Sequence, residues 1–83
     1  MAFKMFSMDN CRSCEYARIA FDDYGCPFVE EKVVDPLDRA TLRALYSAKA
    51  FPIILRGGDY VGGFPHICEL LQQLARAPAQ SQD

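Results

Sequence analysis

A chain of 83 residues and 9.3 kDa leaves room for one small domain, and its content of 51% hydrophobic and 24% charged residues is typical of a globular protein. The net charge of −2 argues against a nucleic-acid-binding module, because such modules usually carry a basic face. No apolar run approaches the ~18 residues of a membrane span and the first residues lack the pattern of a signal peptide, so we expect a soluble, cytoplasmic protein without a membrane partner.

The first half of the chain predicts a strand, a helix and a second strand. Residues 2–7 form a short, largely apolar run that is typical of a strand. Apolar side chains recur at helical spacing over residues 12–24, and Gly25 and Pro27 end this helix. The helical stripe consists of Tyr16, Ala17, Ala20, Phe21 and Tyr24. Residues 28–34 predict the second strand.

The second half predicts a helix, a hairpin and a last helix. Asp35 can cap a helix whose first residue is Pro36, a position that suits the fixed φ of proline. The expected inner face of this helix holds Leu37, Thr41, Ala44, Leu45 and Ala48. Residues 56–59 form a tight turn between two short strands. The last helix is predicted by the three-four spacing of Ile67, Leu70, Leu71 and Leu74.

These elements follow in the order β-α-β-α-β-β-α and predict an α/β fold with one domain over residues 1–76. Residues 77–83 are expected to form a flexible tail. The first three elements form a right-handed parallel unit and the hairpin is antiparallel, which gives a four-stranded mixed sheet flanked by three helices on both faces. Nothing in the sequence suggests an oligomer, so we expect a monomer.

Four cysteines decide most about function: Cys11, Cys14, Cys26 and Cys68. Without a signal peptide a framework of structural disulfides is disfavoured, which leaves a redox pair, a metal site or small buried hydrophobes. A zinc site needs a second ligand pair, but Cys26 stands alone, and His66 and Cys68 are two residues apart on a predicted helix. We therefore predict no metal site, and interpret Cys26 and Cys68 as structural residues.

Cys11 and Cys14 lie where the first strand passes into the first helix. Unpaired N–H groups and the helix dipole favour an anion at this point, and such a setting lowers a thiol pKa from about 8.5 to roughly 3.5–7.5. Arg12 acts in the same direction, whereas Asp9 and Glu15 oppose it. We predict that Cys11 is the nucleophile of a dithiol exchange and that the more shielded Cys14 is the resolving thiol.

Three motifs in this order resemble those of the glutaredoxins of the thioredoxin superfamily. They are the C-x-x-C pair, Phe51-Pro52 before the next strand, and Gly62-Gly63-Phe64 before the last helix. The resemblance covers roughly residues 3–75 and implies a thioredoxin-like fold. It also implies an oxidoreductase that reduces protein disulfides or glutathione mixed disulfides, with glutathione as co-substrate and no tightly bound cofactor.

The resemblance further implies a set of substrate-binding or glutathione-binding residues. Pro52 should be cis and should hold the Phe51 backbone beside Cys11, where it can pair with the backbone of a substrate. Lys49 should contact a glutathione carboxylate, and the two glycines should let the γ-glutamyl end approach. The full set is Arg12, Lys49, Phe51, Pro52, Gly62, Gly63 and Phe64.

The chain departs from the glutaredoxin pattern at several positions. Met8 stands where the family usually has a basic residue, Pro65 replaces a residue that commonly supplies an N–H group, and Arg12-Ser13 replaces Pro-Tyr. Each change removes a familiar glutathione contact. Gly63-Phe64-Pro65 also resembles the NrdH-redoxins, which take electrons from thioredoxin reductase and pass them to ribonucleotide reductase. This is the alternative function; a lesser one is a metal or iron–sulfur cluster-binding module.

Overall fold

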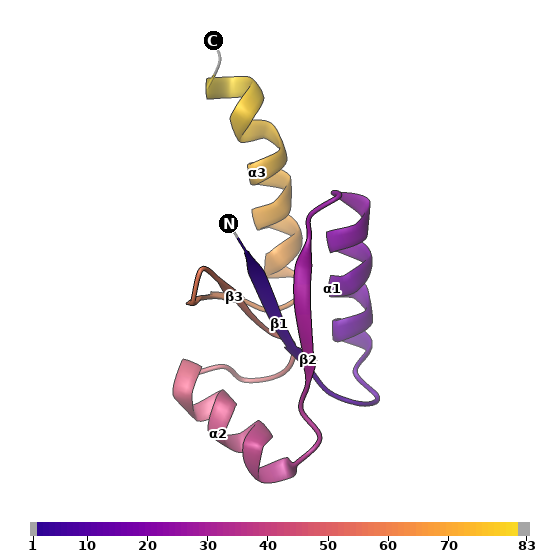
Figure 1. The fold of residues 1–83 in the computed structure, drawn as a ribbon, viewed down its shortest axis with the longest axis vertical. Coiled ribbons are helices and arrows are strands. Elements are labelled where there is room, and N and C mark those ends of the chain that lie inside the picture. The colour runs from indigo at the N-terminus through magenta and orange to yellow at the C-terminus, as the bar shows by residue number, and fades with distance from the viewer. Residues whose placement is uncertain (1, 82–83) are drawn as a thin grey trace.

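A computed structural model of the chain describes the backbone of residues 2–81 and the side chains of residues 2–76. The elements are β1 (Phe3–Ser7), α1 (Arg12–Asp23), β2 (Phe28–Lys32), α2 (Pro36–Tyr46), β3 (Ile53–Arg56), β4 (Asp59–Gly62) and α3 (His66–Ser81) (Figure 1). They form a four-stranded sheet in the order β2-β1-β3-β4. Strand β1 runs parallel to β2 and antiparallel to β3, and β4 is antiparallel to β3. The predicted thioredoxin-like fold is confirmed.

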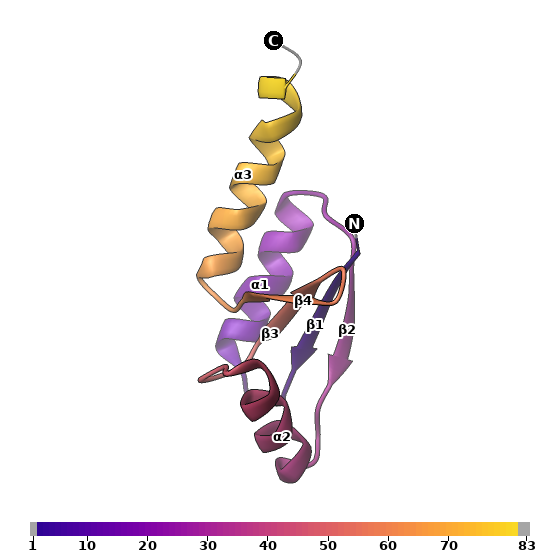
Figure 2. The ribbon, with the colours of Figure 1, turned by 90° about the vertical axis from the view of Figure 1, so that its left-hand side faces the viewer.

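Side chains that alternate along the strands divide the interior into two clusters. The first core lies between the sheet and the pair α1 and α3, which lie side by side on one face (Figure 2). It contains Phe3, Met5, Ala17, Ala20, Phe21, Ile54, Ile67 and Leu71. The second core lies toward α2 and the start of α1, and contains Phe6, Cys14, Val33, Ala48, Phe51, Ile53 and Leu55.

Helix α1 buries a narrower stripe than the sequence predicts. Ala17, Ala20 and Phe21 are buried in the first core, where the Phe21 ring stacks on Phe28 at 4.4 Å between ring centroids. Tyr16 and Tyr24 lie at the two borders of the predicted stripe and are exposed, so their assignment to it is wrong. A phenol at a stripe's border can keep its hydroxyl in water while its ring covers neighbouring apolar surface.

Helix α2 begins as predicted but turns a different face inward. The Asp35 carboxylate caps it by accepting a hydrogen bond from the Leu37 N–H at 2.8 Å. The predicted inner face is wrong for the helix itself, because Leu37 is 76% and Leu45 67% exposed; of its five residues only Ala48, which follows the helix, is buried. Within α2 the partly buried side chains are Arg39, Leu42, Arg43 and Tyr46.

The orientation of α2 has a local physical cause. The Arg39 guanidinium donates hydrogen bonds to the carbonyl groups of Val33 and Val34, at 3.3 and 2.9 Å, which draws the basic side of the helix toward the sheet. Leu42 and Tyr46, one turn apart, are then the apolar side chains of α2 that pack against the second core. In both ribbon views α2 lies at one end of the sheet, so it covers the second face only there (Figures 1 and 2).

The remaining boundaries are close to those expected. The β3–β4 turn has positive φ at Gly57 (58°) and Gly58 (89°), the geometry of a tight hairpin turn that favours glycine. Strand β2 ends two residues before the predicted limit at residue 34. Helix α3 continues to Ser81, past the domain boundary expected at residue 76; that boundary stays a prediction, and residues 82–83 of the expected tail lie outside the described residues.

No helix in the described part of the chain is both long and apolar enough to cross a membrane.

Candidate active site

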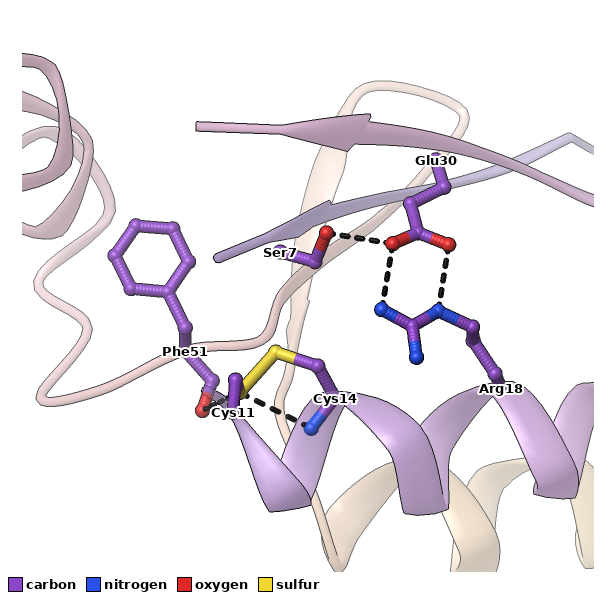
Figure 3. Close-up of a disulfide and its surroundings, with 6 residues drawn as sticks. All are labelled: Ser7, Cys11, Cys14, Arg18, Glu30 and Phe51. Carbon is purple, nitrogen blue, oxygen red and sulfur yellow. Dashed lines mark hydrogen bonds and ion pairs between the residues drawn. A yellow bond between two sulfur atoms is a disulfide. The ribbon is translucent and has the colours of Figure 1, made fainter. Parts of the chain in front are cut away.

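A disulfide joins Cys11 and Cys14 at the start of α1 (Figure 3). Their Cα atoms are 5.2 Å apart, within the usual range for a disulfide. Cys11 is the N-cap residue of α1 with an extended backbone, and Cys14 lies in the first turn. Cys14 is fully buried in the second core, whereas Cys11 is half-buried at its border. The predicted difference in burial between the two cysteines is confirmed.

The Cys11 sulfur takes the place of a capping oxygen. Cys14 N–H donates a hydrogen bond to Cys11 Sγ at 3.1 Å, while Glu15 N–H donates to the Cys11 carbonyl at 3.2 Å. The first N–H groups of a helix have no partner within the helix and carry its positive dipole end. In the reduced protein these N–H groups would face a negative charge on Cys11 Sγ; the predicted low pKa of the Cys11 thiol stays a prediction.

The loop before β3 reaches the same sulfur atom through its backbone. The Phe51–Pro52 peptide bond is cis, as predicted, and Cys11 Sγ lies 3.8 Å from the Phe51 carbonyl oxygen. The Phe51 ring points away from the disulfide and is buried in the second core (Figure 3). Phe51 thus presents its backbone, and not its ring, beside Cys11.

A groove of about 350 Å³ opens at this loop. It is lined by Ser47, Lys49, Ala50, Phe51, Pro52, Tyr60, Gly63 and Phe64. The structure therefore brings together five of the predicted binding residues, while Arg12 and Gly62 are absent from this lining. Tyr60 was missed, because its place depends on how the β3–β4 hairpin folds back.

A larger groove of about 510 Å³ lies between β2 and α2. Its lining residues are Phe6, Glu31, Lys32, Val33, Val34, Asp35, Asp38, Thr41 and Leu42. Neither lining contains a cysteine, but Phe51, whose carbonyl oxygen lies 3.8 Å from Cys11 Sγ, lines only the smaller groove. We therefore assign the candidate active site to the smaller groove beside the Phe51–Pro52 loop.

The two glycines before α3 meet different neighbours. A Cβ atom on Gly63 would lie 2.7 Å from the Pro52 carbonyl oxygen, so the close approach of the two backbones requires glycine. Gly62 has a φ of 117°, and a Cβ atom there would lie 2.8 Å from the His66 ring. The imidazole of His66 therefore covers the backbone at Gly62.

The start of α3 offers few free N–H groups. Pro65 has none, and the Phe64–Pro65 bond is also cis. Ile67 N–H donates to the Gly63 carbonyl at 2.8 Å, and Cys68 N–H donates to the Pro65 carbonyl at 3.0 Å. These donors are used within the turn and are not available to an incoming carboxylate.

A polar network that the sequence did not reveal lies beside the disulfide. Ser7 is the only polar side chain buried among residues 2–76, and its hydroxyl donates to Glu30 Oε2 at 2.6 Å. Arg18 binds the same carboxylate with two hydrogen bonds, at 2.7 and 2.8 Å (Figure 3). We call Ser7, Arg18 and Glu30 the polar clamp. No sequence signal joins its members, because they lie on β1, α1 and β2 and meet only in the folded chain.

The other two cysteines are unpaired and half-buried, and both pack against the first core. Burial raises the pKa of the Cys26 thiol, which makes it less reactive at neutral pH. Among the described residues, no group of three His, Cys, Asp or Glu side chains is arranged to hold a metal ion.

Solved structures with a similar fold are glutaredoxins and a related redoxin. Glutaredoxin 1 from Francisella tularensis, in complex with cacodylate, matches with a TM-score of 0.73 and 20% identity over 88% of this chain and 94% of that one. The buckwheat glutaredoxin–glutathione complex matches with a TM-score of 0.71 and 20% identity over 96% of this chain and 76% of that one. The NrdH-redoxin from Escherichia coli matches with a TM-score of 0.68 and 21% identity over 89% of this chain and 95% of that one. At these identities the likeness establishes the thioredoxin-like fold.

Sequence comparison identifies the family. No curated protein sequence matches the chain. The family model described as glutathione S-transferase, N-terminal domain, matches residues 5–79. Since this match spans most of the chain and the fold agrees with it, the protein belongs to the family of glutathione S-transferase N-terminal domains.

Proposed function

We propose that the protein is a thiol–disulfide oxidoreductase of the glutaredoxin type, with Cys11 as nucleophile and Cys14 as resolving thiol. The observation that carries the proposal is the position of Cys11 Sγ. It caps α1, accepts a hydrogen bond from Cys14 N–H at 3.1 Å and borders the Phe51 carbonyl at the edge of the groove. This arrangement favours a thiolate at the more accessible sulfur while the second sulfur stays buried.

The reaction follows from these positions. The Cys11 thiolate attacks one sulfur of a substrate disulfide, which forms a mixed disulfide and releases the other substrate sulfur as a thiolate. Cys14 then loses its proton to water and attacks Cys11 Sγ. The Cys11–Cys14 disulfide forms, and the second substrate sulfur leaves as a thiolate that water protonates. Two electrons have passed from the protein dithiol to the substrate.

The groove supports a substrate that binds through its backbone. The free edge of the Phe51–Pro52 loop can pair with an extended peptide, as in strand addition. We propose that Lys49 and Phe64 contact the substrate within the groove and that Arg12 borders it outside. Gly62 and Gly63 are proposed to set the backbone of the wall opposite Pro52. Protein disulfides and glutathione mixed disulfides both present such a backbone.

Glutathione as co-substrate is supported by two of the comparisons. The description of the family names glutathione, and the buckwheat relative was solved as a glutathione complex. The family description also names a transferase. Joining glutathione to an acceptor does not require a pair of cysteines, whereas the Cys11–Cys14 disulfide is what a dithiol exchange leaves behind. The pair therefore favours the redox reaction.

A second candidate is a redoxin of the NrdH type, reduced by thioredoxin reductase and serving ribonucleotide reductase. The start of α3 favours it, because Pro65 lacks an N–H group and the donors of Ile67 and Cys68 are already used. A glutathione carboxylate finds fewer partners there. The fold likeness to the Escherichia coli NrdH-redoxin is compatible with this candidate.

A choice of reductant separates the two candidates. The protein is supplied with NADPH and either glutathione plus glutathione reductase, or thioredoxin reductase, and NADPH oxidation is followed with a small disulfide as substrate. Turnover with the glutathione system supports the glutaredoxin type, and turnover only with thioredoxin reductase supports the NrdH type. Absence of turnover with both reductants, at a rate no greater than that of Cys11→Ser, would contradict both candidates.

The proposal extends to the compartment in which the protein acts and to its oligomeric state. We propose that the protein acts as a monomer in the cytoplasm, where thiols are kept reduced and the disulfide can be recycled. The unpaired state of Cys26 and Cys68 is compatible with such a compartment. An iron–sulfur cluster held through Cys11 and glutathione is a lesser alternative, and metal analysis of protein purified without oxygen tests it.

A further inference from the structure

The polar clamp and the resolving cysteine share one face of α1. Arg18 follows Cys14 by four residues, a spacing that places the two side chains on the same helix face with Cβ atoms about 5–6 Å apart. Ser7 is fully buried at the end of β1, and Figure 3 shows its hydroxyl directed at Glu30 on the side of the sheet that faces α1. One positive and one negative side chain are therefore fixed close to the buried cysteine.

Both members of the ion pair stay ionised at neutral pH. The hydrogen bonds from Arg18 and Ser7 hold the pKa of Glu30 below its ordinary value, and the carboxylate raises the pKa of Arg18. The bidentate geometry fixes both side chains. The polar clamp therefore carries two full charges that sum to zero.

We propose that the polar clamp balances charge behind Cys14, so that the reduced site carries its negative charge on Cys11 and keeps Cys14 as a neutral thiol. This inference rests on the proposed dithiol function. Ser7, Arg18 and Glu30 act through Cys14 and are positioning residues. Their role is to set how stable the reduced site is relative to the disulfide.

An unpaired charge near the two cysteines changes the stability of the reduced site in a direction that depends on the sign of that charge. Oxidation of the site removes two electrons and one proton from the Cys11 thiolate and the Cys14 thiol, and forms the sulfur–sulfur bond. The reduced site is negative, whereas the disulfide is neutral. An unpaired cation nearby stabilises the reduced site and an unpaired anion destabilises it.

Two substitutions that break the ion pair should therefore have opposite effects. Glu30→Gln leaves the Arg18 cation unpaired, so we expect a higher, more oxidising reduction potential. Arg18→Gln leaves the Glu30 carboxylate unpaired, so we expect a lower potential. The side chains are 34% and 25% exposed, so water screens the effect. We expect the equilibrium constant between the dithiol and the disulfide to change by about twofold to fivefold. At 29.6 mV for a tenfold change, this is a shift of about 9–21 mV in the reduction potential.

The potential is measured on the full chain at pH 7 by equilibration with defined glutathione redox buffers. Free thiols are then alkylated, and the reduced fraction is read from the mass shift. The double variant R18Q/E30Q should return the potential close to that of the unmodified protein. Arg18→Lys keeps the positive charge, so it should show less than half the shift of Arg18→Gln even if its geometry is poorer.

Glu31→Gln is the matched control. Glu31 is the next residue on β2, its side chain points to the opposite face, and it pairs with Lys4 at 3.0 Å. The substitution changes the net charge by the same amount as Glu30→Gln and should leave the potential unchanged. Urea unfolding of each variant separates a loss of stability from a shift of potential.

Opposite shifts in the two single variants, absent in Glu31→Gln, support the inference. Shifts of the same sign, or none, in variants that remain folded overturn it. If Arg18→Gln does not fold, the sign of the Glu30→Gln shift still decides. Because the potential is read at equilibrium and without a reductase, it does not depend on turnover, and failure of this inference is distinguishable from failure of the proposed function, which the reductant assay reports.

Discussion

The two cores of this molecule differ in how completely they are covered. The first core is closed between the sheet and the pair α1 and α3, and Met5, Phe21 and Ile67 are fully buried in it. Half-buried side chains border both cores, but five of the seven members of the second core are 5–8% exposed, whereas in the first core only Ala20 exceeds 2%. Helix α2 contributes no buried residue to the second core, and half-buried Cys11 lies at its border. The closed core stabilises the fold, and the thinly covered core leaves one sulfur atom accessible next to another that is shielded.

The largest effect should come from the accessible sulfur. We predict that Cys11→Ser abolishes disulfide reduction, because no other thiol caps a helix beside the groove. Cys14→Ser should keep only the steps that end in a glutathione mixed disulfide, since the resolving thiol is gone. Turnover assays with a protein disulfide and with a glutathione mixed disulfide distinguish the two variants. If both behaved like the unmodified protein, the assignment of the site would be wrong.

The closed core should dominate stability. Phe21→Ala removes a fully buried ring that contacts Phe3 and Phe28, and should lower the free energy of unfolding by about 3–5 kcal/mol. Leu42→Ala, in the half-buried border of the second core, should cost about 1 kcal/mol. Urea denaturation measures both. Equal losses would contradict the difference between the two cores.

Gly63 tests whether the wall of the groove has a specific role in turnover. Gly63→Ala introduces a Cβ atom 2.7 Å from the Pro52 carbonyl oxygen, so we expect a loss of about 1–3 kcal/mol in unfolding free energy and weaker substrate turnover. Gly25→Ala is a control for the glycine change, because it also strains a backbone at positive φ but meets no atom within 4 Å and follows the end of α1 opposite to Cys11. It should lower stability while kcat/KM stays unchanged. A loss of kcat/KM in both variants would argue against a specific role for the groove wall.

The smallest effect should come from the outer face of α2. Leu37 and Leu45 are largely exposed, so Leu37→Gln and Leu45→Gln should change the unfolding free energy by no more than about 0.5 kcal/mol. Thermal unfolding of the two variants checks this. Losses of several kcal/mol would mean that these leucines are buried and that α2 presents its predicted face to the sheet.

The sequence was sufficient where the signals are local. The cap at Asp35, the turn at Gly57 and Gly58, and the cysteines at the start of α1 each depend on neighbours within a few residues. The cis bond at Pro52 came from the glutaredoxin resemblance and not from the residues alone. Local chemistry therefore predicted the order of the elements and the location of the disulfide.

The sequence failed where side-chain hydrogen bonds, and not apolar spacing, decide how a segment packs. The apolar stripe of α2 is stronger on the face that the structure exposes, but the hydrogen bonds of Arg39 to the Val33 and Val34 carbonyls turn the other face inward. The polar clamp joins Ser7, Arg18 and Glu30 from three elements. Neither feature has a periodic or neighbouring signal that a single sequence could reveal.

Alkylation of the reduced protein at pH 6 tests the central claim most directly. We predict that Cys11 reacts much faster than Cys26 in the same molecule, because the backbone of α1 stabilises its thiolate whereas burial raises the pKa of Cys26. Mass spectrometry of the digested protein gives both rates from one sample. A Cys11 that reacts no faster than Cys26 would contradict the assignment of Cys11 as the nucleophile.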